Sequence, residues 1–374
     1  MAVTTFPFSG VSRGQTLTFH GIRQWRKFPA HVAPDYRQVF HEASARHPFQ
    51  TVIACYDQAV PGITRFLDRV TTALPMAPIL IPLNAGERLK TIDKIAELTQ
   101  QVSSHYVGGK SLMLVIGGGT LCNAAGFVAT MWHGMEQVVI PTNFTAIADV
   151  AIGSLHMVNV GTHKNRLQLY ADPLAVVLDP DFLTTLSPGE RRNGLAETIK
   201  HGVAQDQQLF EALESHAAAG TVLQDEPLFD FALRTAQLKD ALMASDPFGQ
   251  QTQDTLLYGH VIAHAVESAT DFTMPHGEAV SLGLLGELAF FHGPAAAVLI
   301  RVKALLQQVG LPTTLPFSLP VAQILHHLEH AMTPQGTLVI PRVQHLGSLD
   351  VQSEQHSAEF QRAAVLQALH VLVP

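Results

Sequence analysis

A run of apolar residues that ends in three glycines constrains the fold of this chain more than any other feature. Residues 111–116 (SLMLVI) have the continuous apolar character of a strand buried on both faces, and residues 117–120 (GGGT) follow at once. A helix is expected next, over residues 123–131. A buried strand, a glycine turn and a helix are the parts of an α/β domain. Such a turn lets the backbone approach a phosphate closely, although the same turn also occurs without a ligand.

Further apolar runs predict the rest of a parallel sheet at residues 51–57, 79–83, 137–141 and 175–179. Asp57 closes the first run, and Thr142 and Asn143 follow the third. Because the carboxyl ends of parallel strands meet at one edge, these side chains could hydrogen-bond a cofactor there. Residues 16–19 read as a strand of an edge hairpin.

The pattern becomes helical after Pro180, with amphipathic spacing over residues 193–203, 207–216, 228–245, 277–291, 295–309 and 322–330. The predicted fold class is therefore α/β: an N-terminal Rossmann-like nucleotide-binding domain (1–180) followed by an all-helical C-terminal domain (181–374). A site is expected in the cleft between the two domains.

Composition restricts the partners. The 374 residues are 47% hydrophobic and 14% charged, which fits about two globular domains. The net charge of -8 has no acidic or basic blocks, so neither nucleic acid nor a membrane is expected as a partner. The N-terminus lacks the pattern of a signal peptide, and a cytoplasmic location is expected. Cys55 and Cys122 lie in apolar segments and are expected in the core.

Three histidines form a candidate metal site. His260 and His264 are four residues apart in a segment with helical spacing, so both rings project from one face. Pro275 marks a break that lets His276 fold back from a separate element. A solvated or core pair of histidines is the alternative, since the chain has 20 histidines. Glu197 and Lys200, three apart on a predicted helix, favour the metal, because zinc with an open position commonly takes two histidines and one carboxylate.

Taken in order, these segments resemble the sugar phosphate cyclases of the 3-dehydroquinate synthase superfamily. The resemblance extends from about Asp57 to Gly283 and rests on the following residues: Gly86-Glu87 with Lys90, Gly117 to Gly119, Pro141-Thr142, Asp149, Lys164-Asn165, Thr185, Gly194 to Glu197 with Lys200, Lys239, Gly259-His260 with His264, and His276 to Glu278.

The resemblance implies a catalytic Zn²⁺, or Co²⁺, bound by Glu197, His260 and His276, with His264 as a nearby substrate and proton-transfer group. Lys200, Lys239, Asn165 and Lys164 would line the substrate site, and a homodimer is implied. The residues expected to contact NAD are Asp57, Glu87, Lys90, Gly118, Gly119, Asn123, Thr142, Asn143, Asp149, Lys164 and Thr185.

Such enzymes oxidise one hydroxyl of a sugar phosphate with NAD⁺, which acidifies the neighbouring C–H so that phosphate is eliminated. The ketone is then reduced again, and the opened sugar closes by an aldol step. The metal polarises the oxygens, NAD carries the hydride, and histidine or lysine moves protons.

Departures from the family pattern concern the substrate. Dehydroquinate synthases hold a substrate carboxylate with an arginine and an asparagine, and those positions are Gln253 and Leu257 here. Their absence, together with the residues around Lys164 and Tyr258, favours a substrate without a carboxylate, sedoheptulose 7-phosphate. The alternatives are 3-dehydroquinate synthase, a metal-dependent polyol or glycerol phosphate dehydrogenase, and a homologue that binds ligand without turnover.

Phosphate recognition also departs from the family. Leu155 and His133 replace a lysine and an arginine, no lysine follows Lys303, and Asn123 replaces the glycine-loop aspartate. The lost cationic contacts could have moved to other residues: His133, His156, His163, Arg166 or Arg342.

Overall fold

The computed structural model describes residues 16–20, 27–32, 35–105, 108–161, 163–246, 253–293, 296–316, 319–329, 341–349 and 362–373. The chain divides into two compact units, Met1–Leu186 and Ser187–Pro374. The boundary expected near residue 180 precedes this division. The short 3-10 helix η3 (Pro180–Thr185) stays with the first unit, because the ring of Phe182 is buried and stacks on Phe66 with 4.0 Å between centroids.

The first unit is built on a seven-stranded sheet in the order β1-β2-β9-β6-β5-β3-β4. The strands are β1 (Thr16–His20), β2 (Lys27–Val32), β3 (Thr51–Asp57), β4 (Ile79–Leu83), β5 (Ser111–Gly117), β6 (Met135–Pro141) and β9 (Ala175–Leu178). All neighbours pair in parallel except β1 and β2, which form the predicted antiparallel pair at the edge. The α/β fold and its predicted strands are confirmed.

The strand order places a topological switch point between β3 and β5. The chain passes from β3 to β4 on one side and then returns to β5 on the other side of β3. In open parallel sheets, ligands bind outside the carboxyl ends of the strands at such a point. Asp57 ends β3 and Gly117 ends β5, so two predicted cofactor segments flank the switch point.

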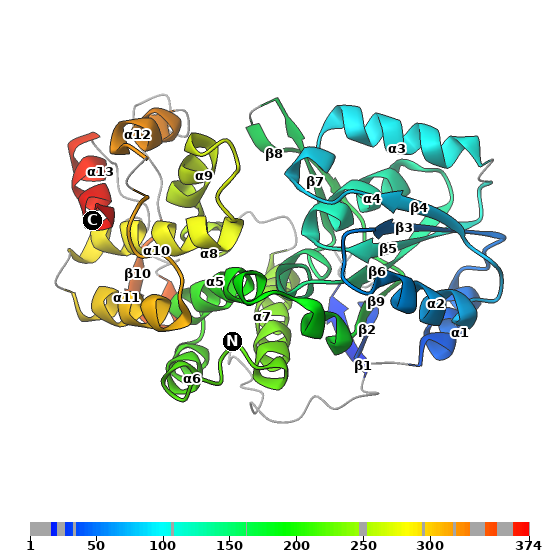
Figure 1. The fold of residues 1–374 in the computed structure, drawn as a ribbon, viewed down its shortest axis with the longest axis horizontal. Helices are drawn as coiled ribbons and strands as arrows, with labels where there is room; N and C mark the ends of the chain where they lie inside the picture. Colours follow the sequence, from blue (N-terminus) through cyan, green and yellow to red (C-terminus); the bar gives the residue numbers. More distant parts are fainter. Residues whose placement is uncertain are drawn as a thin grey trace. The chain divides into compact units, whose positions relative to one another are not determined.

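Helices cover both faces of this sheet (Figure 1). Alternate residues of the central strands, including Val52, Leu114 and Val138, form one buried cluster with α1 (Tyr36–Arg46) and α2 (Ile63–Ala73). The helix α4 (Gly119–Met131) contacts β5 and β6, and α3 (Ile92–Ser104) packs on α4. The glycine turn thus leads directly into a buried helix.

A second, two-stranded sheet was not predicted. It is the antiparallel hairpin β7 (Leu155–Val160) and β8 (His163–Tyr170), which contacts α4. A short segment around residues 146–150 forms a π-helix, η2 (Ala146–Val150), just before it. The hairpin carries Lys164 and Asn165, two of the predicted site residues.

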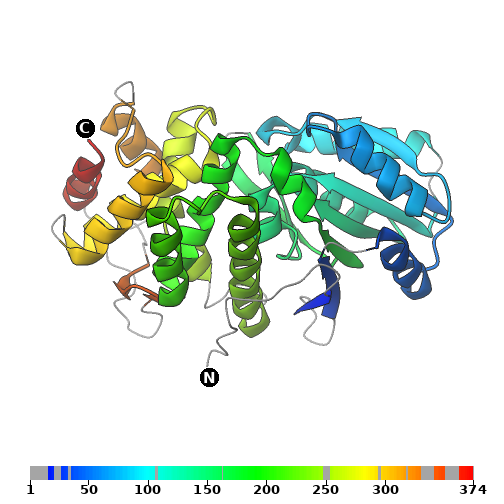
Figure 2. The ribbon, with the colours of Figure 1, turned by 60° about the horizontal axis from the view of Figure 1, so that its bottom comes forward.

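The second unit is helical, as predicted, with one addition. Its helices are α5 (Pro188–Ala204), α6 (Gln207–Ala218), α7 (Asp225–Ser245), α8 (Gln253–Leu257), α9 (His260–Ala269), α10 (His276–His292), α11 (Ala297–Val309), α12 (Val321–Glu329), α13 (Arg362–Leu369) and η4 (His370–Leu372). The second unit also contains a small hairpin of β10 (Val343–His345) and β11 (Ser348–Leu349), so the prediction of an all-helical domain is not fully correct. Figures 1 and 2 show α5 beside α6 and α7. Among the described residues, no helix combines the length and apolar character needed to span a bilayer.

Helix α5 begins earlier than its apolar pattern indicates. Ser187 and Glu190 form a capping box, with Pro188 in the first turn, so polar residues start the helix before residue 193.

Helix α5 packs against the start of α10, where a Cβ at Gly277 would lie 1.9 Å from Asn193 O. The Gly277 N–H donates to Asn193 Oδ1 at 2.6 Å. This close contact aligns α5 with α10.

Candidate functional site

Three helices of the second unit bring Glu197, His260 and His276 together. Glu197 lies within α5, His260 begins α9 and His276 begins α10. One ligand atom from each lies within 4.8 Å of the others. Both histidine Nε2 atoms face the same oxygen, Glu197 Oε1, at 3.3 Å for His260 and 3.0 Å for His276. Two imidazoles and one carboxylate are the donor set of a catalytic divalent-metal site.

The opposite nitrogen of each ring is held by an acceptor. His276 Nδ1 lies 3.0 Å from Glu267 Oε1, and His260 Nδ1 lies 3.1 Å from Tyr258 O. A proton on each Nδ1 leaves Nε2 with its lone pair toward a metal, which is the usual outer arrangement of metal-binding histidines. The residues present therefore fit the expected Zn²⁺ or Co²⁺.

Glu267 was not predicted from the sequence. It lies seven residues after His260 on α9, two turns along the same face, and its side chain is buried. That spacing is the signal that could have identified it.

The charges in this cluster shift two pKa values in opposite directions. Burial alone would raise the pKa of Glu197, but the Lys200 ammonium at 2.6 Å and His260 hold it well below its usual range. Burial alone would lower the pKa of His276, but the carboxylates of Glu197 and Glu267 raise it to about 9. Glu197 therefore stays ionised, and the carboxylates of Glu197 and Glu267 favour positive charge on the His276 ring.

Of the predicted substrate residues of the second unit, His264 and Lys200 lie beside this cluster. His264 is one turn after His260, with 5.5 Å between ring centroids, and is half-buried without joining the three ligand atoms. Lys200 contacts Glu197 and donates to Leu256 O at 3.0 Å. Lys239 is buried on α7. Gln253 and Leu257, the two departures, are the ends of the short helix α8.

The nucleotide residues of the first unit gather at the carboxyl edge of its sheet. Gly118 is the N-cap of α4 and Gly119 its first residue, while the Thr142 N–H donates to Gly117 O at 3.0 Å. Asp57 Oδ1 accepts from Ala59 N at 3.0 Å. The Thr142 contact thus ties the end of β6 to the end of β5, just before the start of α4.

Close contacts within the chain explain in part why glycine occupies positions 118 and 119. A Cβ at Gly118 would lie 2.4 Å from Asn143 Nδ2, and one at Gly119 would lie 3.0 Å from Val150 Cγ2. Asn143 Oδ1 in turn accepts from Ala146 N at 2.9 Å. These contacts support the structural reading of the glycine turn, and the phosphate-binding reading stays a prediction.

A polar network joins four predicted residues through one that was not predicted. Asn159 on β7 donates from Nδ2 to Glu87 Oε1 at 2.7 Å and accepts at Oδ1 from Asn165 N at 2.9 Å. Lys90 Nζ lies 2.5 Å from Asn165 Oδ1, and Lys164 Nζ lies 3.9 Å from Glu87 Oε1. Asn165 has a left-handed backbone with φ 57°, which asparagine tolerates better than most residues. The network carries both expected NAD contacts and an expected substrate contact.

Asn123 and Thr185 have local roles that the sequence did not indicate. Asn123 donates from Nδ2 to Gly119 O at 3.1 Å and accepts at Oδ1 from Met157 N at 2.8 Å, so it ties β7 to α4. An aspartate could not donate the first of these bonds. Thr185 Oγ1 donates to Phe182 O at 2.7 Å. Asp149, also expected near NAD, lies in η2.

The structure contradicts the prediction that His156 could supply a cationic contact to phosphate. It is buried, with Nε2 2.7 Å from Gln137 Nε2, and burial lowers its pKa to about 4. A neutral, buried imidazole supplies no positive charge to a phosphate. His133 and Arg166 are exposed, and Arg342 is half-buried beside Phe291. The side chain of His163 lies outside the described part of the structure.

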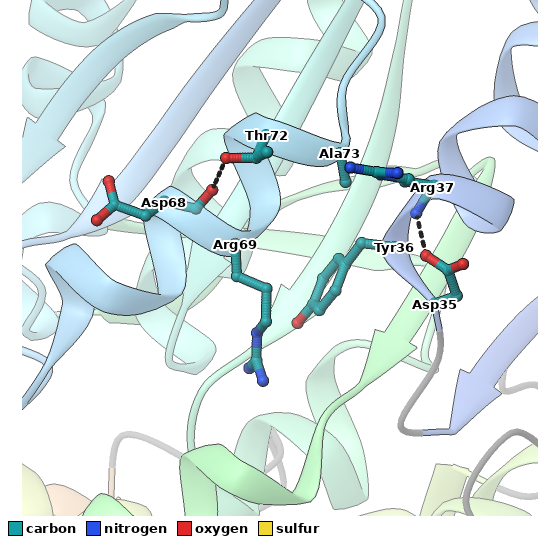
Figure 3. Close-up of a pocket in the computed structure, with 7 residues that line it drawn as sticks. All are labelled: Asp35, Tyr36, Arg37, Asp68, Arg69, Thr72 and Ala73. Atoms are coloured by element: carbon teal, nitrogen blue, oxygen red, sulfur yellow. Dashed lines mark hydrogen bonds between the residues drawn. The ribbon is translucent and has the colours of Figure 1, made fainter.

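The two cysteines and the residues lining the cavity in Figure 3 are not among the predicted site residues, and Cys122 Sγ donates to Gly117 O at 3.5 Å beside the glycine turn. Cys55 and Cys122 are buried as predicted, and burial raises the pKa of both thiols to about 12. Figure 3 shows Arg69 among the residues that line a cavity, whose volume is about 490 Å³. Arg69 pairs with Asp179 and Asp181 at 2.5 and 3.0 Å, so its charge is already neutralised. The residues lining the cavity are Asp35, Tyr36, Arg37, Asp68, Arg69, Thr72 and Ala73.

Comparison with known proteins identifies the family. Residues 80–193 match the model of the 3-dehydroquinate synthase N-terminal domain, and residues 194–332 match that of the C-terminal domain. The 3-dehydroquinate synthase of Rippkaea orientalis is 36% identical over 257 residues, which are 67% of this chain and 70% of that protein.

Two solved structures have the same fold. One is 2-deoxy-scyllo-inosose synthase complexed with carbaglucose-6-phosphate, NAD⁺ and Co²⁺ (TM-score 0.83, 21% identity, covering 95% of this chain and 99% of that chain). The other is 2-epi-5-epi-valiolone synthase from Streptomyces hygroscopicus subsp. jinggangensis 5008 with NAD⁺ and Zn²⁺ bound (TM-score 0.78, 24% identity, covering 92% and 96%). The chain therefore belongs to the 3-dehydroquinate synthase family and is a sugar phosphate cyclase of that superfamily.

Proposed function

We propose that this protein is an NAD- and divalent-metal-dependent cyclase that eliminates phosphate from a seven-carbon sugar phosphate and closes the product to a carbocycle. The observation that supports the proposal most strongly is the convergence of Glu197, His260 and His276, with both Nδ1 atoms held by acceptors. The bound metal supplies polarisation of the substrate oxygens, and NAD supplies transient hydride transfer.

In this proposal the chain's own residues bind the substrate and move its protons. His264 stands one turn beyond His260 and is the candidate for proton transfer. Lys200 and Lys239 supply positive charge in the second unit. Lys90, which donates from Nζ to Asn165 Oδ1 at 2.5 Å, supplies positive charge in the first unit. A homodimer is part of the proposal, and analytical ultracentrifugation would check it.

The named relatives favour a carboxylate-bearing substrate. The relative reported above is a 3-dehydroquinate synthase, and this supports the alternative from the sequence better than it supports sedoheptulose 7-phosphate. We therefore infer that the heptulosonate phosphate substrate of 3-dehydroquinate synthase is the first substrate to test. Lys200 and Lys239 are the cations that could pair with its carboxylate.

Sedoheptulose 7-phosphate is kept as a second candidate because of three positions. Gln253 and Leu257 are the ends of α8, and Leu155 begins β7. Gln253 lacks the charge of the family's arginine, Leu257 lacks the amide of its asparagine, and Leu155 lacks the charge of its lysine. A buried carboxylate without its partner typically costs about 3–5 kcal/mol, or several hundred-fold or more in affinity. On this argument the heptulosonate would be the poorer substrate.

One experiment separates the candidates. Phosphate release is measured with each sugar phosphate in the presence of NAD⁺ and Zn²⁺ or Co²⁺, while NADH is followed by absorbance. A higher kcat/KM with the heptulosonate supports 3-dehydroquinate synthase, and a higher value with sedoheptulose 7-phosphate supports the second candidate. Accumulation of NADH with turnover would instead indicate a polyol phosphate dehydrogenase. Metal and NAD binding with neither phosphate release nor NADH formation would contradict the proposed cyclase activity.

A further inference from the structure

The helix that carries His260 begins without a side-chain cap of its own. Its N-cap is Gly259, which has a left-handed φ of 79° and no side chain to accept a hydrogen bond. The first N–H groups of a helix have no partner within the helix and need an acceptor from elsewhere when they are buried. Gly259, His260 and Ile262 are all buried, so this need applies to α9.

Glu287 of α10 supplies that acceptor. Glu287 Oε2 accepts from Gly259 N at 2.7 Å, and Oε1 accepts from Val261 N at 3.0 Å and Ile262 N at 3.3 Å. The side chain is completely buried, at 0% exposure. Burial raises the pKa of Glu287 to about 8 and the backbone N–H groups oppose this rise. Both protonation states retain acceptor lone pairs on the oxygens.

Close packing of α9 and α10 makes this contact geometrically possible. A Cβ at Gly283 would lie 1.9 Å from Gly259 O, and a Cβ at Gly286 would lie 2.6 Å from Ile262 Cδ1. Both glycines are on the same helix as Glu287 and within four residues of it. The small residues let the two helices approach until the carboxyl group reaches the start of α9.

The same peptide group links Glu287 to the imidazole. The N–H of Gly259, which Glu287 binds, belongs to the peptide whose carbonyl is Tyr258 O. That carbonyl faces His260 Nδ1 at 3.1 Å. A hydrogen bond at one end of a peptide group polarises the other end and strengthens its bond. A continuous path therefore runs from Glu287 through one peptide to His260, whose Nε2 faces Glu197.

We propose that Glu287 is a positioning residue for the metal ligand His260, acting through the Tyr258–Gly259 peptide and the first turn of α9. The inference rests on the metal site of the proposed function. Glu287 does not touch the cluster itself, so its effect is on the orientation and the Nδ1 hydrogen bond of His260. Outer residues of this kind typically change metal affinity by about 10–100-fold.

The test compares Glu287→Gln with Ser281→Ala in the full-length protein. Glutamine keeps the shape, but its amide nitrogen cannot accept, so at least one of the three backbone N–H groups loses its partner. Ser281 is a matched control: it is a fully buried polar residue of the same helix, and its Oγ donates to Glu278 O and Pro312 O, away from α9. Both variants are expected to lower the melting temperature.

Metal binding distinguishes positioning from general stability. Competition with a chromogenic chelator should show about 10-fold or greater weakening of Zn²⁺ binding in Glu287→Gln and less than about twofold change in Ser281→Ala. The visible spectrum of the Co²⁺-loaded protein should change only in Glu287→Gln, while NAD affinity stays constant in both. If Glu287→Gln does not fold, Glu287→Asp, which keeps the acid but shortens its reach, carries the same test.

Unchanged Zn²⁺ affinity and Co²⁺ spectrum in a destabilised Glu287→Gln protein would overturn the inference and leave Glu287 as a structural cap only. Failure of the unmodified protein to bind Zn²⁺ or Co²⁺ at all would instead contradict the metal site of the proposed function. The two failures are therefore distinguished by the unmodified protein alone.

Discussion

Two histidines, one in each unit, have opposite electrostatic environments. His276 in the second unit lies between two carboxylates, Glu197 and Glu267, and its pKa rises to about 9. His156 in the first unit is more deeply buried, at 5% exposure, and faces the neutral amide of Gln137, and its pKa falls to about 4. Burial acts in the same direction on both rings, so the neighbouring carboxylates decide the difference. A metal site is therefore recognised by the groups around a histidine and not by its burial.

The largest effect is expected when His276 is removed. His276→Ala leaves two of the three ligands, and a site of two ligands should bind Zn²⁺ on the order of 1000-fold more weakly, with turnover lost in parallel. Elemental analysis after dialysis measures the bound metal. His292→Ala is the matched control, since His292 ends the same helix and contacts Val343 O instead. Full metal occupancy in His276→Ala would show that His276 is not a metal ligand, and the contrast between His276 and His156 would then not concern a metal site.

Protonation of His156 should lower the stability of the folded protein as the pH falls. Its folded-state pKa of about 4 lies below the ordinary value of 6.5, so the unfolded chain binds the proton more readily. The contribution of neutral His156 is complete above pH 6.5 and is lost as the pH falls toward 4. At pH 5 the loss is roughly 2 kcal/mol relative to pH 7.

Urea unfolding at pH 7 and pH 5 checks this expectation. His156→Gln, which does not titrate, should lose less stability than the unmodified protein between the two values. His133→Gln removes an exposed histidine of the same unit and serves as the control. Equal losses in the unmodified protein and in His156→Gln would show that this ring is not held neutral by burial.

The smallest effect is expected at the glycine turn. This predicted site consists of backbone groups, whereas the candidate metal site consists of side chains. Gly118→Ala should weaken NAD binding by about 10-fold or more, because a side chain keeps the pyrophosphate away from the backbone. The new Cβ would also meet Asn143 Nδ2 at 2.4 Å. The double variant Gly118→Ala with Asn143→Ala removes that internal clash.

Calorimetry of NAD binding then separates the two causes. If the phosphate contact requires glycine, the double variant remains weaker than Asn143→Ala alone. Recovery of the double variant to the affinity of Asn143→Ala would mean that Gly118 serves only the packing of the turn.

The sequence by itself determined most strands of the large sheet, the glycine turn and the residues of the candidate metal site. Strands such as residues 51–57 and 79–83 coincide with β3 and β4, because continuous apolar runs bounded by turn residues are a local signal. The spacing of His260 and His264 and the break at Pro275 are equally local. Glu197, His260 and His276 meet as the resemblance implied.

Only the tertiary structure decided the environment of these residues. The hairpin of β7 and β8 has a mixed polar pattern, and it is held partly by Asn123 of α4, which lies 34 positions before its partner Met157. His156 is buried because Gly126 leaves space for it: a Cβ there would lie 2.2 Å from the ring. Glu287 reaches the start of α9 from a different helix. The burial of a residue and its hydrogen-bond partners depend on contacts between segments that are distant in the sequence. A local pattern of residues does not specify such contacts.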